Sequence, residues 1–360
     1  MFDILEYVKK NLATFEKEPL NEVDAMVFSW LTYYRLPKEM YKMNSFKTIC
    51  LKDFYNAKYF DDLLYDIFDR EKSKLLLDYI AANSRFRDVE MFYYVEKASK
   101  KVEKQFAAMT FKIGKNAYVI AYRGTDHTFI GWKEDLNMSF LKNIPSQIEA
   151  KKYLEKVVSK VKGNIYIAGH SKGGNLAIYA GYFMDKKSVS RVKGIYNFDG
   201  PNLNRELTNN LIRNNVDDRI TKLVPQSSVV GMCFDKTNNY SIVRSNTIGM
   251  LQHSPFSWEV DKDKFKILKD TAFDSKIFKK SINTLIDDLS QEELKLFVDT
   301  IYSIIDGTNT NTVEELMSNL AKNAKVIFDS FNGMDEERKK LIFKVSDMYI
   351  KESFKNILKV

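Results

Sequence analysis

The sequence predicts a protein of the α/β class, with a mostly parallel central sheet, helices on both faces and helical segments at both ends. Short β-forming runs alternate with helix-periodic segments between residues 105 and 261, a pattern typical of βαβ units. Residues 1–104 and 262–360 carry mainly helical periodicity. Hydrophobic residues make up 44% of the 360 positions, which is enough to bury a large core. We therefore expect an N-terminal helical segment packed on a central core, and a C-terminal helical segment or cap.

The elements of the core can be placed in order. Two β-forming runs flank Gly114-Lys115-Asn116, which predicts a hairpin. A helix, an apolar strand and a second helix are then expected, followed by alternating strands and helices as far as residue 244. The expected strands are 105–113, 117–122, 164–168, 192–198, 220–224 and 240–244, and the expected helices are 148–160, a segment ending near 185, and 204–214.

Capping patterns place helices in both flanks. Asn21 and Asp24 have the spacing of a capping box before a helix-periodic run that includes Trp30. Ser290 and Glu293 have the same spacing and predict a helix that ends near Gly307. The aromatic residues in these segments are expected to be core residues.

Charge and composition argue against several classes of function. The net charge is +8, from 56 basic and 48 acidic residues, and no block of like charge indicates a nucleic-acid partner. The three histidines and two cysteines form no metal-ligand spacing, and no phosphate-loop, nicotinamide or flavin motif is present, so neither metal nor cofactor is expected. The acidic N-terminus differs from a signal peptide, and no apolar run approaches the roughly 18 residues of a membrane span. We expect a cytoplasmic protein without stable membrane insertion.

The strongest motif is Gly169-His170-Ser171-Lys172-Gly173, which lies between the apolar strand 164–168 and a predicted helix. This G-x-S-x-G pattern in a strand–turn–helix context is typical of a nucleophile elbow. The turn must be tight enough to exclude side chains at 169 and 173, and it places Ser171 beside a helix N-terminus that favours a developing oxyanion. Ser171 is therefore the expected nucleophile.

This elbow, together with Tyr122-Arg123-Gly124-Thr125-Asp126 and Gly131-Trp132-Lys133-Glu134-Asp135, resembles the class 3 (fungal-type) lipases. The likeness covers roughly residues 105–260 and is greatest to a bacterial branch of lipase-like proteins of unsettled function. It implies an α/β-hydrolase fold and an oxyanion hole formed by the backbone N–H groups of Thr125 and Lys172, with the Thr125 hydroxyl as a further candidate donor. We expect Trp132 in the core, Asp135 in a fixed polar contact, and the Lys172 side chain in solvent.

The base must be one of three histidines. His170 adjoins the nucleophile and should point into the packing of the elbow, as its counterpart does in the resembled family. His127 precedes the elbow, which is the wrong chain order for this fold. His253 follows the last predicted strand of the core and is therefore the expected base.

The acid is less clearly marked. The resembled family takes it from the segment after strand 220–224, but this chain has no carboxylate between Gln226 and Gly231. Asp199, at the end of strand 192–198, is the preferred candidate, and Asp235 is the second. A third alternative is a weak dyad in which Ser228 or a backbone carbonyl orients the base.

These residues predict a serine hydrolase that cleaves an ester, on a small molecule or a lipid, through an acyl-enzyme intermediate. A peptidase or thioesterase could use the same groups. The alternative from a different class is a non-catalytic scaffold that binds a protein partner through its helical flanks.

Overall fold

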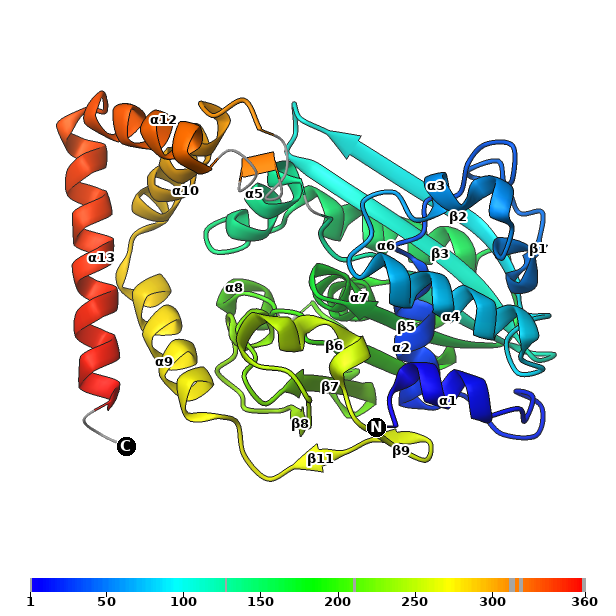
Figure 1. The fold of residues 1–360 in the computed structure, drawn as a ribbon. Helices are drawn as coiled ribbons and strands as arrows, with labels where there is room; N and C mark the ends of the chain where they lie inside the picture. Colours follow the sequence, from blue (N-terminus) through cyan, green and yellow to red (C-terminus); the bar gives the residue numbers. More distant parts are fainter. Residues whose placement is uncertain (1, 127, 210–211, 311–314, 317–319, 358–360) are drawn as a thin grey trace.

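The computed structural model describes the chain except residues 1, 127, 210–211, 311–314, 317–319 and 358–360. A large mixed sheet runs through the molecule, with helices on both of its faces (Figure 1). Its strand order within the described residues is β1 (Ile49–Cys50), β2 (Glu90–Ser99), β3 (Lys104–Ile113), β4 (Ala117–Tyr122), β5 (Asn164–His170), β6 (Val192–Phe198), β7 (Ile220–Pro225), β8 (Ser241–Val243) and β11 (Ile267–Leu268). The strands β9 (Val260–Asp261) and β10 (Lys264–Phe265) form a separate small hairpin.

Only the centre of the sheet is parallel. Strands β4 to β8 pair in parallel, whereas β1 to β4 and the β8–β11 edge are antiparallel. The expectation of a mostly parallel sheet is therefore wrong for the outer strands. Part of the reason is β2, which lies in the segment predicted to be helical and extends the predicted β3–β4 hairpin into a meander. The predicted hairpin itself is confirmed, with Ile113 opposite Ala117.

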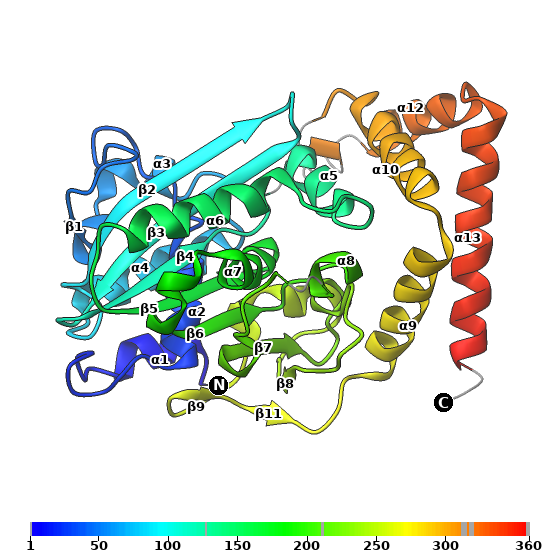
Figure 2. The ribbon, with the colours of Figure 1, turned by 180° about the vertical axis from the view of Figure 1, so that it is seen from behind.

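Helices cover both faces of the sheet (Figures 1 and 2). The N-terminal α1 (Ile4–Lys10), α2 (Glu22–Leu31), α3 (Phe60–Leu63) and α4 (Arg70–Ala82) lie on one side; α6 (Pro145–Val158) and α7 (Lys172–Phe183) lie on the other. Two short helices, α5 (Phe129–Asn137) and α8 (Arg205–Thr208), follow β4 and β6. Helix α8 is shorter than the predicted helix 204–214, of which residues 210–211 lie outside the described part of the chain.

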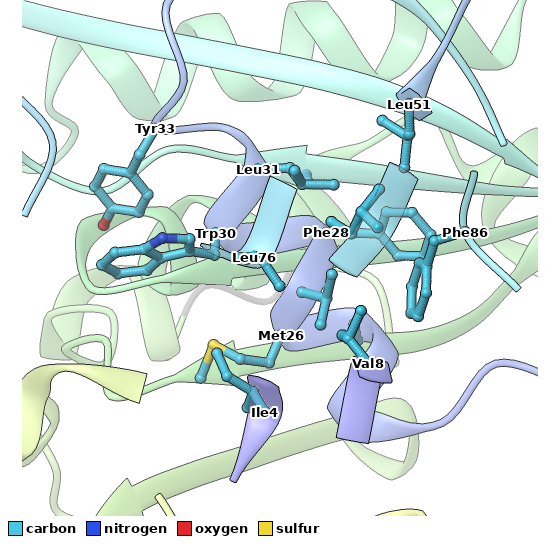
Figure 3. Packing of buried hydrophobic residues seen from close by; sticks show 14 of the residues in the cluster. Ile4, Val8, Met26, Phe28, Trp30, Leu31, Tyr33, Leu51, Leu76 and Phe86 are labelled. Atoms are coloured by element: carbon cyan, nitrogen blue, oxygen red, sulfur yellow. The ribbon is translucent and has the colours of Figure 1, made fainter. Parts of the chain in front are cut away.

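The N-terminal helices share one apolar core with the sheet. Their buried side chains include Ile4, Val8, Met26, Phe28 and Trp30, which interlock with residues of α4 and the following loop (Figure 3). The Asn21–Asp24 capping box predicted for α2 is confirmed, because each side chain accepts a hydrogen bond from the other's backbone N–H.

The C-terminal helices form an arm at the edge of the molecule (Figure 2). They are α9 (Phe273–Asp288), α10 (Gln291–Asp306), α12 (Leu320–Asn332) and α13 (Glu336–Ile357). The predicted Ser290–Glu293 capping box opens α10, and Gly307 caps its end, as expected. The short strands β9–β11 precede the arm, so the helical character predicted from residue 262 begins at residue 273 instead. None of the described helices is long and apolar enough to cross a membrane.

Candidate active site

Ser171 occupies a sharp turn between β5 and α7. Its backbone has φ 58° and ψ −133°, a strained conformation for a residue with a side chain. A Cβ at Gly169 would lie 2.1 Å from the Gly173 carbonyl, and one at Gly173 would lie 2.1 Å from the carbonyl oxygen of Tyr122. The tight turn therefore requires both glycines, as the sequence predicted.

A histidine and a carboxylate meet beside this turn. His253, in the loop after β8, has its Nδ1 2.6 Å from Oδ2 of Asp199. The Asp199 carboxylate is 1% exposed, and its Oδ1 accepts hydrogen bonds from the Ser228 hydroxyl and from the Gly231 N–H. An ionised carboxylate accepts only, so Nδ1 carries the proton and Nε2 is left as the basic nitrogen.

The other two acid alternatives have different partners. The Asp235 carboxylate pairs with Lys222 at 3.1 Å and with Lys279 at 3.5 Å, and it accepts two backbone N–H groups of its own turn. Ser228 donates to Asp199 and not to His253. Ser228 thus supports the acid rather than replacing it, and no local pattern around Ser228 predicts this connection.

His170 is buried beneath the site and positions it. Its Nε2 lies 2.8 Å from the backbone carbonyl of His253, and its Nδ1 lies 3.0 Å from the Tyr33 hydroxyl. A carbonyl can only accept, so Nε2 carries the proton and Tyr33 donates to Nδ1. Burial lowers the pKa of His170 well below its usual value, and the His253 charge acts in the same direction, so the ring is neutral. The predicted packing role of His170 agrees with these contacts.

Ser171 and His253 belong to the same small region. The imidazole of His253 lies 4.5 Å, centroid to centroid, from that of His170, the residue before the nucleophile. Within the described residues, the Ser171 hydroxyl is not hydrogen-bonded to His253, and contacts between a nucleophile and its base often tighten only when substrate binds. His127, the remaining histidine, lies outside the described residues.

The loop after β4 lies against the nucleophile. A Cβ at Gly124 would fall 2.9 Å from Cβ of Ser171, so the adjoining Thr125 is close to the elbow. The Thr125 hydroxyl donates to Oδ2 of Asp135, which confirms the fixed polar contact expected of Asp135. This hydroxyl is thereby occupied, and the backbone N–H is left as the donor that Thr125 can offer.

Two predictions about Lys172 and its neighbours on α5 are wrong. The Lys172 side chain is fully buried and pairs with Glu134 at 3.0 Å, so the expectation that it lies in solvent is wrong. Trp132 is 49% exposed, so its predicted core position is also wrong. Because α5 presents Glu134 rather than Trp132 to the core, it buries a carboxylate that the hydrophobic pattern did not indicate. No group of three or more potential metal ligands was found among the described residues.

The fold and site together define an α/β protein with a serine at a strand–turn–helix junction and a His–Asp pair beside it. The chain belongs to the Mbeg1-like family, whose model matches residues 80–303. Among solved structures, the M37 lipase is 17% identical, with a TM-score of 0.38, over 59% of this chain and 70% of the lipase chain. At that TM-score no feature of the site is carried over from the lipase. No curated protein matches the chain.

Proposed function

We propose that this chain is a serine hydrolase of the α/β-hydrolase fold that cleaves esters through Ser171, His253 and Asp199. The hydrogen bond between His253 Nδ1 and Asp199 Oδ2 is the observation that carries the proposal. It joins two loops that are 54 residues apart, beside a serine in a strained turn. Neither packing nor turn formation requires this combination, whereas nucleophilic catalysis does.

The chemistry follows from the roles of these groups. Ser171 Oγ attacks the ester carbonyl carbon, and its proton passes to Nε2 of His253. Asp199 stabilises the imidazolium through Nδ1–H. The N–H groups of Thr125 and Lys172 are the proposed oxyanion donors. The intermediate collapses when the C–O bond to the alcohol breaks and His253 returns the proton to the alcohol oxygen. Water then repeats the sequence on the acyl-enzyme and frees the acid and Ser171.

Asp199 has the features of an orienting acid. It is buried, two donors hold its second oxygen, and its own backbone N–H donates to the Leu223 carbonyl at 2.8 Å. Such a carboxylate keeps a fixed direction toward the histidine ring. The motif resemblance to class 3 lipases supports an ester as the substrate, and the acyl chain is to be found by comparing p-nitrophenyl esters of increasing length.

Labelling with a fluorophosphonate probe tests the proposal. We expect the wild type to react and Ser171→Ala not to react, while the control Ser159→Ala, on an exposed helix end, reacts like the wild type. Asp199→Asn should lower kcat for p-nitrophenyl acetate by about 10²–10⁴-fold, because the amide no longer holds the productive tautomer. A wild-type protein that neither labels nor hydrolyses any ester, but binds a partner, would establish the scaffold alternative instead.

A further inference from the structure

Lys172 directly follows the nucleophile and is the first residue of α7. A cation is disfavoured there, because the N-terminal end of a helix carries partial positive charge. The side chain is nevertheless fully buried. A buried ion pair is on average no more stabilising than well-packed apolar residues of similar volume. Stability alone therefore does not account for a lysine at this position.

Its partner Glu134 connects several elements. The Glu134 carboxylate accepts hydrogen bonds from Lys172 Nζ at 3.0 Å, from the Ser146 N–H at 2.9 Å and hydroxyl at 2.8 Å, and from the Gln105 N–H at 2.9 Å. These donors come from α7, from the start of α6 and from β3. These donors thus hold the Glu134 carboxylate in one orientation, and the carboxylate in turn holds the Lys172 ammonium. Burial alone would lower the pKa of Lys172, but Glu134 and Asp135 raise it above its usual value, so the ammonium stays charged.

The neighbouring Asp135 extends this connection to the other oxyanion residue. Its Oδ2 accepts from the Thr125 hydroxyl, and its Oδ1, which is buried without a hydrogen-bond partner in the described structure, lies 3.8 Å from Lys172 Nζ. The side chains of Thr125 and Lys172 therefore end on two adjacent carboxylates of one helix. The backbone N–H groups of these same two residues are the proposed oxyanion donors.

We propose that the Glu134–Lys172 ion pair is a positioning device, which holds the two oxyanion donors at a fixed separation by tying the elbow to α5. This inference rests on the proposed function. The two donors lie 47 positions apart in the chain, on a loop and on a helix, and their backbones alone do not fix their spacing. The ion pair between Lys172 and the fixed Glu134 carboxylate sets this spacing without contacting substrate.

The test replaces both charges together. Lys172→Met with Glu134→Gln keeps the volume and removes both charges of the pair. The remaining amide oxygen can still accept from the Gln105 N–H and the Ser146 hydroxyl, and Asp135 keeps its bond from Thr125. We expect kcat for p-nitrophenyl acetate to fall about 10–100-fold with KM changed by less than about twofold, because the loss is confined to the transition state. Lys172→Arg, which can still pair with Glu134, should retain most of kcat.

Lys133→Met is the matched control. This lysine lies on the same helix but pairs with Glu103 and with Asp299 of the C-terminal arm, and not with the elbow. We expect its kcat to stay within about threefold of the wild type. A similar loss in Lys133→Met and in the double variant would mean that general loosening of α5 is responsible, and would overturn the proposal.

The pH dependence of kcat provides a measurement that a loss of packing alone would not change. Burial raises the pKa of Asp135 to about 6. The Lys172 charge and the Thr125 hydrogen bond oppose this increase, whereas the charges of Glu134 and Asp126 add to it. Tyr33 and Cys233 are the other ionisable groups that face Asp135. The double variant removes the Lys172 charge, which lowers this pKa, and the Glu134 charge, which raises it. The Lys172 effect is the larger of the two, so the pKa of Asp135 should rise further. Because a protonated Asp135 holds Thr125 less well, the acid limb of kcat should move to higher pH in the double variant and not in Lys133→Met.

The outcomes separate the two proposals. A wild type that does not label with the fluorophosphonate contradicts the proposed function itself. A wild type that labels, with a double variant whose kcat and pH profile are unchanged, contradicts only the positioning role. If the double variant does not give a cooperative thermal transition, Glu134→Asp, which keeps both charges but shortens the side chain that reaches Lys172, gives the decision. An unchanged kcat in that variant would reject the role of the ion pair.

Discussion

The two ends of the chain are both helical, but they join the molecule in different ways. The N-terminal helices contribute fully buried residues to the same apolar core as strands β2 to β8. The C-terminal helices have a small cluster of their own, built around Leu285, Leu289, Leu294, Leu341 and Val345. A cavity of about 1170 Å³ lies between this arm and the core, lined by residues that include Tyr182, Lys222 and Ile286. The N-terminal segment is thus part of the core, and the arm is an attachment to it.

The same contrast appears in their ion pairs, but not in their links to the site. Asp24 and Arg85 form a pair in which both side chains are completely buried, whereas the side chains of Lys344 and Glu293 in the arm are 46% and 34% exposed. The N-terminal segment reaches the site through the Tyr33–His170 hydrogen bond. The arm contacts α5 through Asp299 and Lys133. Its helix α9 also contacts the loops of the site, because the Ser275 hydroxyl donates to the Ser228 carbonyl and Lys279 pairs with Asp235. Both ends of the chain therefore touch residues that adjoin the candidate site, although only the N-terminal segment shares the main core.

Arg85→Met is expected to have the largest effect. The guanidinium binds both oxygens of Asp24 and three backbone carbonyls, so its loss leaves a buried carboxylate and several acceptors without partners. We expect the free energy of unfolding to fall by about 3–5 kcal/mol, as for other broken buried pairs. Urea denaturation followed by tryptophan fluorescence measures it. Adding Asp24→Asn should recover part of the loss, and no recovery would show that the carboxylate charge is not the cause.

A pair of phenylalanines compares the two ends directly. Phe28 is fully buried, and its ring lies 4.8 Å from that of Phe111; Phe343 on α13 is 62% exposed. Phe28→Ala should destabilise the protein by about 3–5 kcal/mol through lost burial and an unfilled cavity. Phe343→Ala should change stability by no more than about 0.5 kcal/mol. Equal losses in the two variants would contradict the view that the arm lies outside the main core.

The sequence could predict the elements whose signal is local. The hairpin after β3, the strand–turn–helix around Ser171 and the caps of α2 and α10 depend on residues a few positions apart, and all are present. Strand β2 was missed because its run of aromatic and apolar residues lacks the alternation of an exposed strand. Its first half is covered on both faces, and its pairing is irregular between Phe92 and Val95.

The contacts around the site were harder to predict because they join distant segments. Nothing local to Tyr33 indicates a bond to a histidine 137 residues away. The burial of Lys172 likewise depends on Glu134, whose position is set by Gln105 and Ser146 from two further elements. A lysine side chain is ordinarily expected to lie in solvent, and it is buried only where a matching carboxylate lies close by.

Tyr33→Phe tests the link between the N-terminal segment and the site, with a smaller expected effect. The change removes one hydroxyl and leaves the buried Nδ1 of His170 without a donor, which costs about 1–3 kcal/mol. Because His170 in turn holds the His253 carbonyl, fluorophosphonate labelling should also slow, by a few-fold. Tyr34→Phe is the control, since its hydroxyl binds the Ser73 carbonyl away from the site. Slower labelling in both variants would point to lost stability rather than to His170.

Lys344→Met, in the arm, should have the smallest effect. The ammonium contacts Glu293, but both side chains are solvated, and exposed pairs contribute about 0–1 kcal/mol that salt screens further. We expect a thermal midpoint within about one degree of the wild type at physiological salt, and no change in labelling. Since Lys344 joins α13 to the start of α10, a large loss would mean that packing within the arm is coupled to the folding of the core. The arm would then resemble the N-terminal segment in its energetics although it differs in its packing.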